Sequence, residues 1–281
     1  SILDKIRVVP VTERTGRFPD LNLFGSMTGG QTPLASGMTA GSRTEGGEYG
    51  ERELTFEDIR YSVSNSISGK IPVPKELVKD SPVSLATIIQ DSIVNTKRSF
   101  CIYFLFNGSG VGHPLGIFNR GAIVDVNATT NNQFVKKNAS AMASRLLNIN
   151  GNDNNIFWAA HRSMMEDIDA IEDSTANSVV VLASSNGRTI ENIKGYPIEY
   201  TTHVPLADSQ GCINLIDGDA YVFFQLTGEN GEGVEINYYD QNSLTHDIWT
   251  FDCRMDGQPI MRSTVAYSDN YAMSPYIRFN D

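Results

Sequence analysis

The chain has 281 residues and a formal net charge of −11 at pH 7, and 40% of its residues are hydrophobic. A folded chain of this length buries about three quarters of its unfolded surface and divides into about two domains. Three cysteines without paired spacing exclude a disulfide framework and structural zinc. Cys101, Cys212 and Cys253 are therefore expected to be small core residues of a reduced, soluble, cytoplasmic protein.

The charge is unevenly distributed along the chain. Residues 1–149 hold 16 Lys/Arg against 13 Asp/Glu, whereas residues 150–281 hold 6 against 20. Non-specific nucleic-acid affinity needs clustered cations that displace phosphate counterions, so this composition argues against it. The imbalance favours contacts between basic and acidic parts of two copies, or simply the solubility that an acidic surface gives.

The amino-terminal part of the chain contains few apolar residues in a pattern that could form a hydrophobic core. Residues 1–10 are charged and contain no apolar core of a signal peptide. Because the first residue is Ser and not Met, we expect either that a protease or simple loss of Met has processed the amino terminus, or that the sequence was trimmed there. Residues 18–50 are rich in glycine and small polar residues and show almost no aliphatic periodicity. Because this segment is too long for an ordinary connection, we expect disorder or an extended arm that becomes ordered on another molecule.

An alternating pattern follows in residues 54–73, which predicts a half-buried strand or hairpin. The segment from Glu51 onward suggests a two-stranded projection with a glycine-rich tip. The residues of the buried parity are Ile59, Tyr61, Val63, Ile67, Ile71 and Val73.

A long helix is predicted next. Asp80-Ser81-Pro82 offers an N-cap followed by proline at the first helical position, and residues 83–106 contain no Gly or Pro. Such a helix is roughly 35 Å long. Its expected apolar stripe consists of Leu85, Ile88, Ile89, Ile93, Phe100 and Phe104.

The glycine run that ends this helix, residues 108–112, is not a phosphate loop. It follows a helix rather than a strand, and no Lys or Arg occurs between Arg98 and Arg120. A helix C-cap and turn are predicted instead. Residues 99–119 are uncharged over about the length of a membrane span, but only Phe100 to Phe106 is continuously apolar, so we reject a transmembrane helix.

After Arg120 the pattern is that of a compact mixed α+β region. We predict helices over 134–147 and 158–171 and a buried strand over 178–183. Residues 192–200 indicate a turn into a further strand. Period-two alternation returns over 234–238 and 249–255, and the end of the chain is expected to pair with the early strands. The apolar side of the first helix is Ala139, Met142, Ala143 and Leu146, Ile156 leads into the second helix, and Asp256-Gly257 predicts a hairpin turn.

No catalytic, cofactor-binding or metal-binding constellation is expected. The four histidines, His113, His161, His203 and His246, lack metal-ligand spacing and read as surface or capping residues. The acidic groups at 217–219 and 166–169 lack a calcium-loop pattern, so a cation there is a minor alternative.

In order along the chain, several loose motifs resemble the major capsid protein of tailed double-stranded DNA bacteriophages, with its Hong Kong 97-type fold. They are Ser1–Thr12, Leu54-Thr55-Phe56, Pro74–Ser81, Asn107-Gly108-Ser109-Gly110, Pro114-Leu115-Gly116-Ile117, Ile193–Ile198, Ile216–Asp219 and Cys253–Gly257.

The resemblance implies an α+β fold with an N-terminal arm at 1–17 and an extended loop at 18–58. A peripheral domain with a long spine helix would comprise 59–111 and 233–281, and an axial domain 112–232. The extended loop would contact a neighbouring subunit. A segment without its own core could then be ordered, because the neighbour supplies the surface on which it packs. The contact residues implied are Phe24, Met27, Thr32, Leu34, Met38, Tyr49 and Arg52.

Some members of the family join subunits through a Lys–Asn isopeptide bond, with the lysine in the extended loop. Here no Lys occurs between Lys5 and Lys70, Tyr49 stands about where that lysine would be, and no Lys follows Lys194. A shell without covalent cross-links is therefore expected.

The function implied is that of a virion shell protein. Copies would assemble in the host cytoplasm into hexamers and pentamers that enclose double-stranded DNA without reading its sequence. The acidic second half would reduce adhesion of the DNA to the wall. Portal, scaffolding and decoration proteins are the implied partners, and no membrane is involved. The alternatives are an encapsulin-type shell around cargo enzymes and, more remotely, an enzyme.

Overall fold

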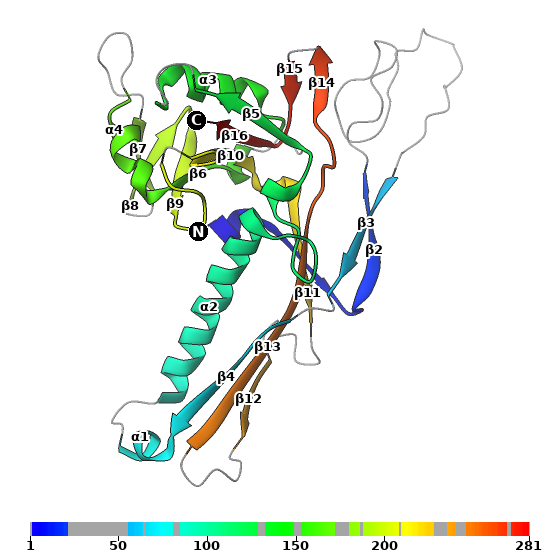
Figure 1. The fold of residues 1–281 in the computed structure, drawn as a ribbon, viewed down its shortest axis with the longest axis vertical. Coiled ribbons are helices and arrows are strands. Elements are labelled where there is room, and N and C mark those ends of the chain that lie inside the picture. Colours follow the sequence, from blue (N-terminus) through cyan, green and yellow to red (C-terminus); the bar gives the residue numbers. More distant parts are fainter. Residues whose placement is uncertain are drawn as a thin grey trace.

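The computed structural model describes residues 2–21, 56–63, 66–80, 85–128, 133–148, 153–171, 180–185, 188–207, 209–227, 235–239, 246–268 and 271–280. Within these residues the fold is mixed α and β. Two larger sheets lie at opposite ends of the molecule, a long helix runs beside one of them, and a two-stranded ribbon projects to one side (Figure 1).

The first sheet has five strands and is organised around one long strand, β13 (His246–Pro259). At its carboxyl end β13 pairs antiparallel with β11 (Tyr221–Leu226), which in turn pairs in parallel with β1 (Arg7–Val11). Its amino-terminal part lies between β12 (Glu235–Tyr239) and β4 (Ser66–Pro74). The predicted return of the chain end onto the early strands is confirmed for β13 and β4.

The hairpin turn predicted at Asp256-Gly257 is wrong, because β13 continues through both residues. A Cβ at Gly257 would lie 2.3 Å from the Tyr221 hydroxyl oxygen and 3.0 Å from the Phe223 ring. The glycine therefore makes room for two aromatic rings of the neighbouring strand. Glycine within a strand often marks such a close approach.

The alternating segment forms two strands that belong to different sheets. β3 (Phe56–Ser62) pairs antiparallel with β2 (Thr15–Leu21), whereas β4 pairs with β13. Ile59, Val63 and Val73 are buried, as the parity predicted. A hairpin within 54–73 is wrong, since the partner of β3 lies about forty residues earlier in the chain.

The second sheet has seven strands and packs against α3 (Lys136–Arg145). Residues Ile156–Ala160 of its central strand are fully buried, because the strand is covered on both faces. The helix predicted over 158–171 is wrong for this reason: a doubly covered strand shows no alternation. In sheet order the strands are β5 (Ile123–Asn127), β16 (Tyr276–Asn280), β10 (Ile213–Asp217), β6 (Ile156–His161), β9 (Tyr196–Thr201), β8 (Arg188–Ile193) and β7 (Val180–Ser185).

Only a short helix remains of that prediction: a 3-10 turn, η4 (Arg162–Met164), leads into α4 (Met165–Asp169). The helix over 134–147 is confirmed as α3, with Ala139, Met142 and Leu146 buried. The strand over 178–183 corresponds to β7, and the turn near 194 joins β8 to β9.

The long helix is α2 (Leu85–Asn107), preceded by the short α1 (Lys75–Asp80). The predicted cap at Ser81-Pro82 lies outside the described residues. In the carboxyl-terminal half Leu105 and Phe106 are fully buried, but Ile88 and Phe100 of the predicted stripe are 51% and 43% exposed. The stripe is thus only partly right, since Ile93 and Phe104 are buried whereas Ile88 and Phe100 are exposed.

The predicted cap and turn after this helix are confirmed. The Gly108 N–H donates to the Phe104 carbonyl oxygen at 3.0 Å, and the Gly116 N–H donates to the Gly108 carbonyl oxygen at 2.9 Å. Gly110 and Gly112 have φ of +76° and +74°, which favours glycine. Among the described residues, none of the helices is long and apolar enough to cross a membrane.

Shorter elements complete the fold. The three cysteines are buried and free, which confirms their expected place in the core.

The chain begins and ends close to the seven-stranded sheet (Figure 1). The remaining elements are η1 (Ile2–Lys5), η2 (Ile117–Asn119), η3 (Asp153–Asn155), η5 (Gly218–Ala220), β14 (Val265–Ser268) and β15 (Tyr271–Met273).

Candidate subunit interface

The ribbon formed by β2 and β3 packs against the five-stranded sheet at the end from which it projects, which we call its base. The Phe18 and Tyr61 rings contact the ring of Phe224, with centroid distances of 5.7 and 4.7 Å. Ile59 and Val63 join the same buried cluster with Val11 and Val222. One face of the ribbon base is thus apolar and packed against β11.

Three hydrogen bonds fix the base further. The Val63 N–H donates to the Arg14 carbonyl oxygen at 2.7 Å, and the Ser62 N–H donates to Asp256 Oδ2 at 2.9 Å. Arg262 Nη2 donates to the Asp58 carbonyl oxygen at 2.9 Å. Burial raises the pKa of the Asp256 carboxyl above its usual range, and the hydrogen bonds that it accepts partly offset this shift.

Away from this base the ribbon points outward from both sheets (Figure 1). Its far ends, Leu21 and Phe56, are joined by the segment in which the sequence places the contact residues of the extended loop. All seven lie outside the described residues: Phe24, Met27, Thr32, Leu34, Met38, Tyr49 and Arg52. Their role remains a proposal.

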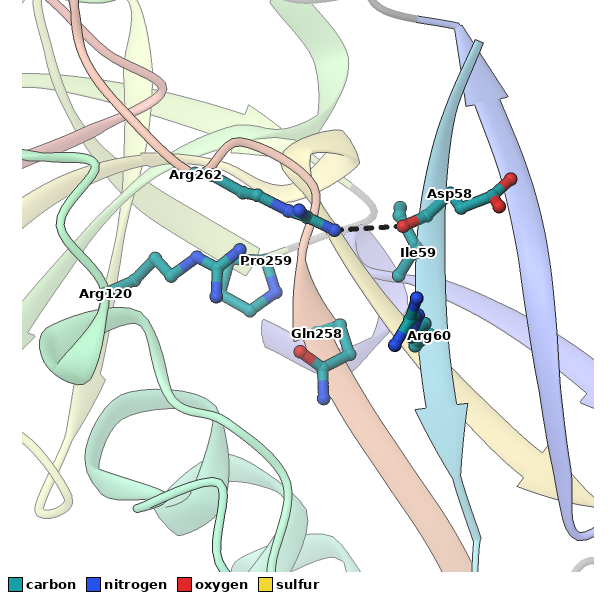
Figure 2. A pocket seen from close by; sticks show the side chains of 7 residues that line it. All are labelled: Asp58, Ile59, Arg60, Arg120, Gln258, Pro259 and Arg262. Atoms are coloured by element: carbon teal, nitrogen blue, oxygen red, sulfur yellow. Dashed lines mark hydrogen bonds between the residues drawn. The ribbon is translucent and has the colours of Figure 1, made fainter.

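A second feature is a pocket of about 480 Å³ between the ribbon base and the end of β13. It is lined by Asp58, Ile59, Arg60, Arg120, Gln258, Pro259 and Arg262. Figure 2 shows the guanidinium groups of Arg60, Arg120 and Arg262 on three sides of this space, which we call the arginine pocket. The Asp58 carboxylate points away from it, toward β2.

A third feature is a group of aromatic side chains where α2 ends, which we call the aromatic patch. Phe100 and Tyr103 are 43% and 46% exposed. Both contact Phe104, whose ring stacks on His113 at 5.0 Å, and Tyr103 also contacts the ring of His203. Large aromatic side chains in one exposed group are typical of protein contact surfaces.

Two of the residues considered for metal or capping roles, His161 and Asp217, cap 3-10 turns. His161 Nδ1 accepts the Ser163 N–H at 3.0 Å, so the expected capping role of this histidine is confirmed. Asp217 caps η5 by accepting the Asp219 N–H. In the part of the chain that the structure describes, three or more His, Cys, Asp or Glu side chains nowhere gather to hold a metal ion.

Sequence reasoning missed both the arginine pocket and the aromatic patch. Arg60, Arg120 and Arg262 are far apart in sequence, and only the folded topology brings them together. We predicted that Phe100 belongs to the buried stripe of the helix, which is wrong. Tyr103 lies outside that stripe, and this position was the one sequence signal that it would be exposed.

The comparisons with known proteins agree on one fold. The model of the phage capsid family matches residues 25–263. The structure resembles a capsid chain of a native GTA particle, with a TM-score of 0.68, 13% identity, and coverage of 100% of this chain and 90% of that chain. No curated protein matches the sequence.

Two further structures extend this comparison. The holo-SrpI encapsulin complex from Synechococcus elongatus PCC 7942 gives a TM-score of 0.64 at 12% identity, over 99% of this chain and 86% of that chain. A chain of Microbacterium phage Oxtober96 gives 0.59 at 11% identity, over 100% and 90%. At such low identity these similarities show the shared fold. Since the family model spans most of the sequence, the chain belongs to the phage capsid family and is a structural protein of the capsid.

Proposed function

We propose that this chain is the major head protein of a tailed bacteriophage, and that its copies form hexamers and pentamers of a closed icosahedral shell around double-stranded DNA. The β2–β3 ribbon carries this proposal. It projects from the body of the subunit, which supports a contact with a second copy in that direction. Portal, scaffolding and decoration proteins, and assembly in the host cytoplasm, belong to the same proposal.

The division into domains is also a proposal. Residues 1–17 would form the arm, 18–58 the extended loop, 59–111 and 233–281 the peripheral domain, and 112–232 the axial domain. Support comes from the two larger sheets and from α2, which runs beside the five-stranded one. We count β16 with the axial part, since it pairs with β5 and β10. β1 and β11 belong to the five-stranded sheet, so we count both of them with the peripheral part.

The aromatic patch supports the same function. Its exposed rings of Phe100 and Tyr103 would be covered by a neighbouring subunit, because a shell buries side surfaces of every copy. The seven loop residues named from the sequence, from Phe24 to Arg52, would make the reciprocal contact.

An encapsulin-type shell is the second candidate, and the similarity to the holo-SrpI encapsulin favours it. The two functions differ in the contents of the particle. Nucleic acid bound inside purified particles supports the phage head, whereas a copurified enzyme supports the encapsulin.

Electron microscopy of the full chain, expressed with its genomic neighbours, tests the function directly. Closed angular shells tens of nanometres across are expected, and only monomers or small oligomers would contradict the proposal. On a boiled denaturing gel the shell should run as single subunits, since the chain lacks a lysine between Lys5 and Lys70. A ladder of multimers would contradict the absence of covalent cross-links.

Deleting residues 25–47 tests the extended loop separately. We expect a folded subunit that fails to assemble. Normal particles from this deletion would overturn the proposed role of the loop, while circular dichroism and thermal unfolding would show that the subunit still folds.

A further inference from the structure

The walls of the arginine pocket come from four parts of the chain. β3 contributes Asp58 to Arg60, the loop after η2 contributes Arg120, β13 contributes Gln258 and Pro259, and the loop after β13 contributes Arg262. The pocket therefore forms where the projecting ribbon meets the body of the subunit (Figure 2). A ligand in this place would touch both parts at once.

The pocket is rich in positive charge. Arg60 lies directly opposite Arg17 in the β2–β3 register, and like charges at opposed positions destabilise a strand pair. Asp58 is the acidic residue of the lining, and its carboxylate accepts from Arg17 Nη1 at 3.4 Å on the side facing β2. The hydrogen bond from Arg262 goes to the backbone carbonyl oxygen of Asp58, not to its carboxylate.

Planar guanidinium groups arranged around one space are suited to oxyanions. Arg pairs with a carboxylate through two parallel N–H···O bonds, and such charge-assisted bonds are roughly twice as strong as neutral ones. A pocket of about 480 Å³ has room for side chains of a peptide segment. The chemistry of this site is that of a carboxylate receptor.

The rest of the chain provides a source of carboxylates. Residues 150–281 contain 20 Asp/Glu against 6 Lys/Arg. Within them, α4 exposes Glu166, Asp167 and Asp169 in five residues. α4 lies at the edge of the molecule opposite the ribbon (Figure 1), and subunits in a closed ring meet through unlike surfaces on opposite sides.

We propose that the arginine pocket receives carboxylate side chains from an acidic segment of a neighbouring copy of this chain, and so fixes the ribbon base in the assembled shell. This inference rests on the proposed shell function. A second copy is favoured over a DNA phosphate as the occupant, since the chain as a whole is strongly acidic and repels a polyanion.

Arg60 is the residue to change, because it is exposed and lies on the ribbon. Arg60→Glu should fold with a thermal midpoint at least as high as that of the unaltered chain, because it removes the repulsion from Arg17. It should lower the yield of closed shells by at least about tenfold, since a charge pair with the neighbouring copy becomes a charge clash. Arg60→Lys should retain most of the assembly, because it keeps the charge. Arg14→Glu, on the exposed turn before β2, is the control for net charge and should assemble normally.

A cross-linking experiment identifies the occupant. A photoreactive amino acid in place of Gln258 should, in assembled particles, form a bond to an acidic segment of a second copy, read by mass spectrometry. Cross-links only to DNA or only within one chain would overturn the proposal. Normal assembly of Arg60→Glu would also overturn the proposal for the pocket, but it would not contradict the shell function. Absence of shells from the unaltered chain would instead overturn the shell function itself.

Discussion

The seven-stranded sheet and the β2–β3 ribbon are built on opposite principles. β6 lies in the middle of the sheet, with Ile156 to Ala160 fully buried, and α3 closes one side of this core. The described part of the ribbon buries one face, on Phe224 and its neighbours. The sheet is stable through its own residues, whereas the ribbon depends on a few contacts that fix its direction.

This difference would suit the function proposed for each region. An element with few buried apolar contacts opens at lower free-energy cost than the core of its domain. Such an element is able to adjust to a neighbour, while the sheet keeps its shape. The following substitutions test the comparison in order of decreasing effect.

Trp158→Ala should have the largest effect. Trp158 is fully buried in β6, contacts the ring of Phe134, and donates from Nε1 to the Ile193 carbonyl oxygen at 3.0 Å. Truncation leaves a cavity and removes the indole hydrogen bond, so the free energy of unfolding should fall by about 3–5 kcal/mol. Denaturant unfolding of the full chain measures this. The control Val111→Ala, at a side chain that is 83% exposed, should change it by less than about 0.5 kcal/mol.

A loss as small as that of the control would mean that the sheet is not the stable part of the molecule. The comparison with the ribbon would then fail at its first step.

Gly108→Ala should come next. A Cβ at Gly108 would lie 2.0 Å from the Pro114 carbonyl oxygen and 2.7 Å from that of Phe104, so the backbone after α2 must shift. Forcing a group into a filled space costs about 1–3 kcal/mol. Gly121→Ala is the matched control, because its nearest neighbour, the Arg262 carbonyl oxygen, is 3.7 Å away. Thermal unfolding should separate the two variants, and equal midpoints would contradict the tight turn.

The sequence predicts the parts of this fold that depend on local pattern. Alternation identified β3, β4, β12 and β13, and helical spacing identified α3. In β3, β4 and α3 one side is more deeply buried than the other. It failed at β6, which is covered on both faces, and at Gly257, where the glycine makes room for Tyr221 and Phe223. Both errors arise from tertiary packing, which a local pattern does not contain.

The candidate interface was less predictable than the fold. The family resemblance pointed to the extended loop, but the arginine pocket depends on residues up to about two hundred positions apart. Arg17 and Arg60 become neighbours only through the β2–β3 register, and Arg262 reaches them from the end of the five-stranded sheet. No spacing of residues within one segment predicts that these arginine side chains lie together.

Tyr61→Ala tests the ribbon itself. Its ring stacks on Phe224 at 4.7 Å, and such aromatic pairs contribute about 0.5–1.5 kcal/mol beyond area burial. We expect faster hydrogen exchange at the amides of β2 and β3, while those of β6 and β10 keep their protection. Tyr61→Phe retains the ring and should behave like the unaltered chain. Equal loss of protection in both sheets would show that the ribbon and the seven-stranded sheet unfold as one unit.

Asp256→Asn should have the smallest effect and one that depends on pH. Burial is the main cause of the raised pKa of Asp256, so as pH rises above the usual Asp range the unfolded chain ionises before the folded one. The unfolded state then binds fewer protons, and this carboxyl contributes less stability as pH rises to its folded pKa. The free energy of unfolding of the unaltered chain minus that of Asp256→Asn should fall through this window and level off above it. A difference that grows with pH would mean that the hydrogen bonds from Ser62 and Gly257, not burial, control this carboxyl, and that the ribbon base is held by a charged clamp.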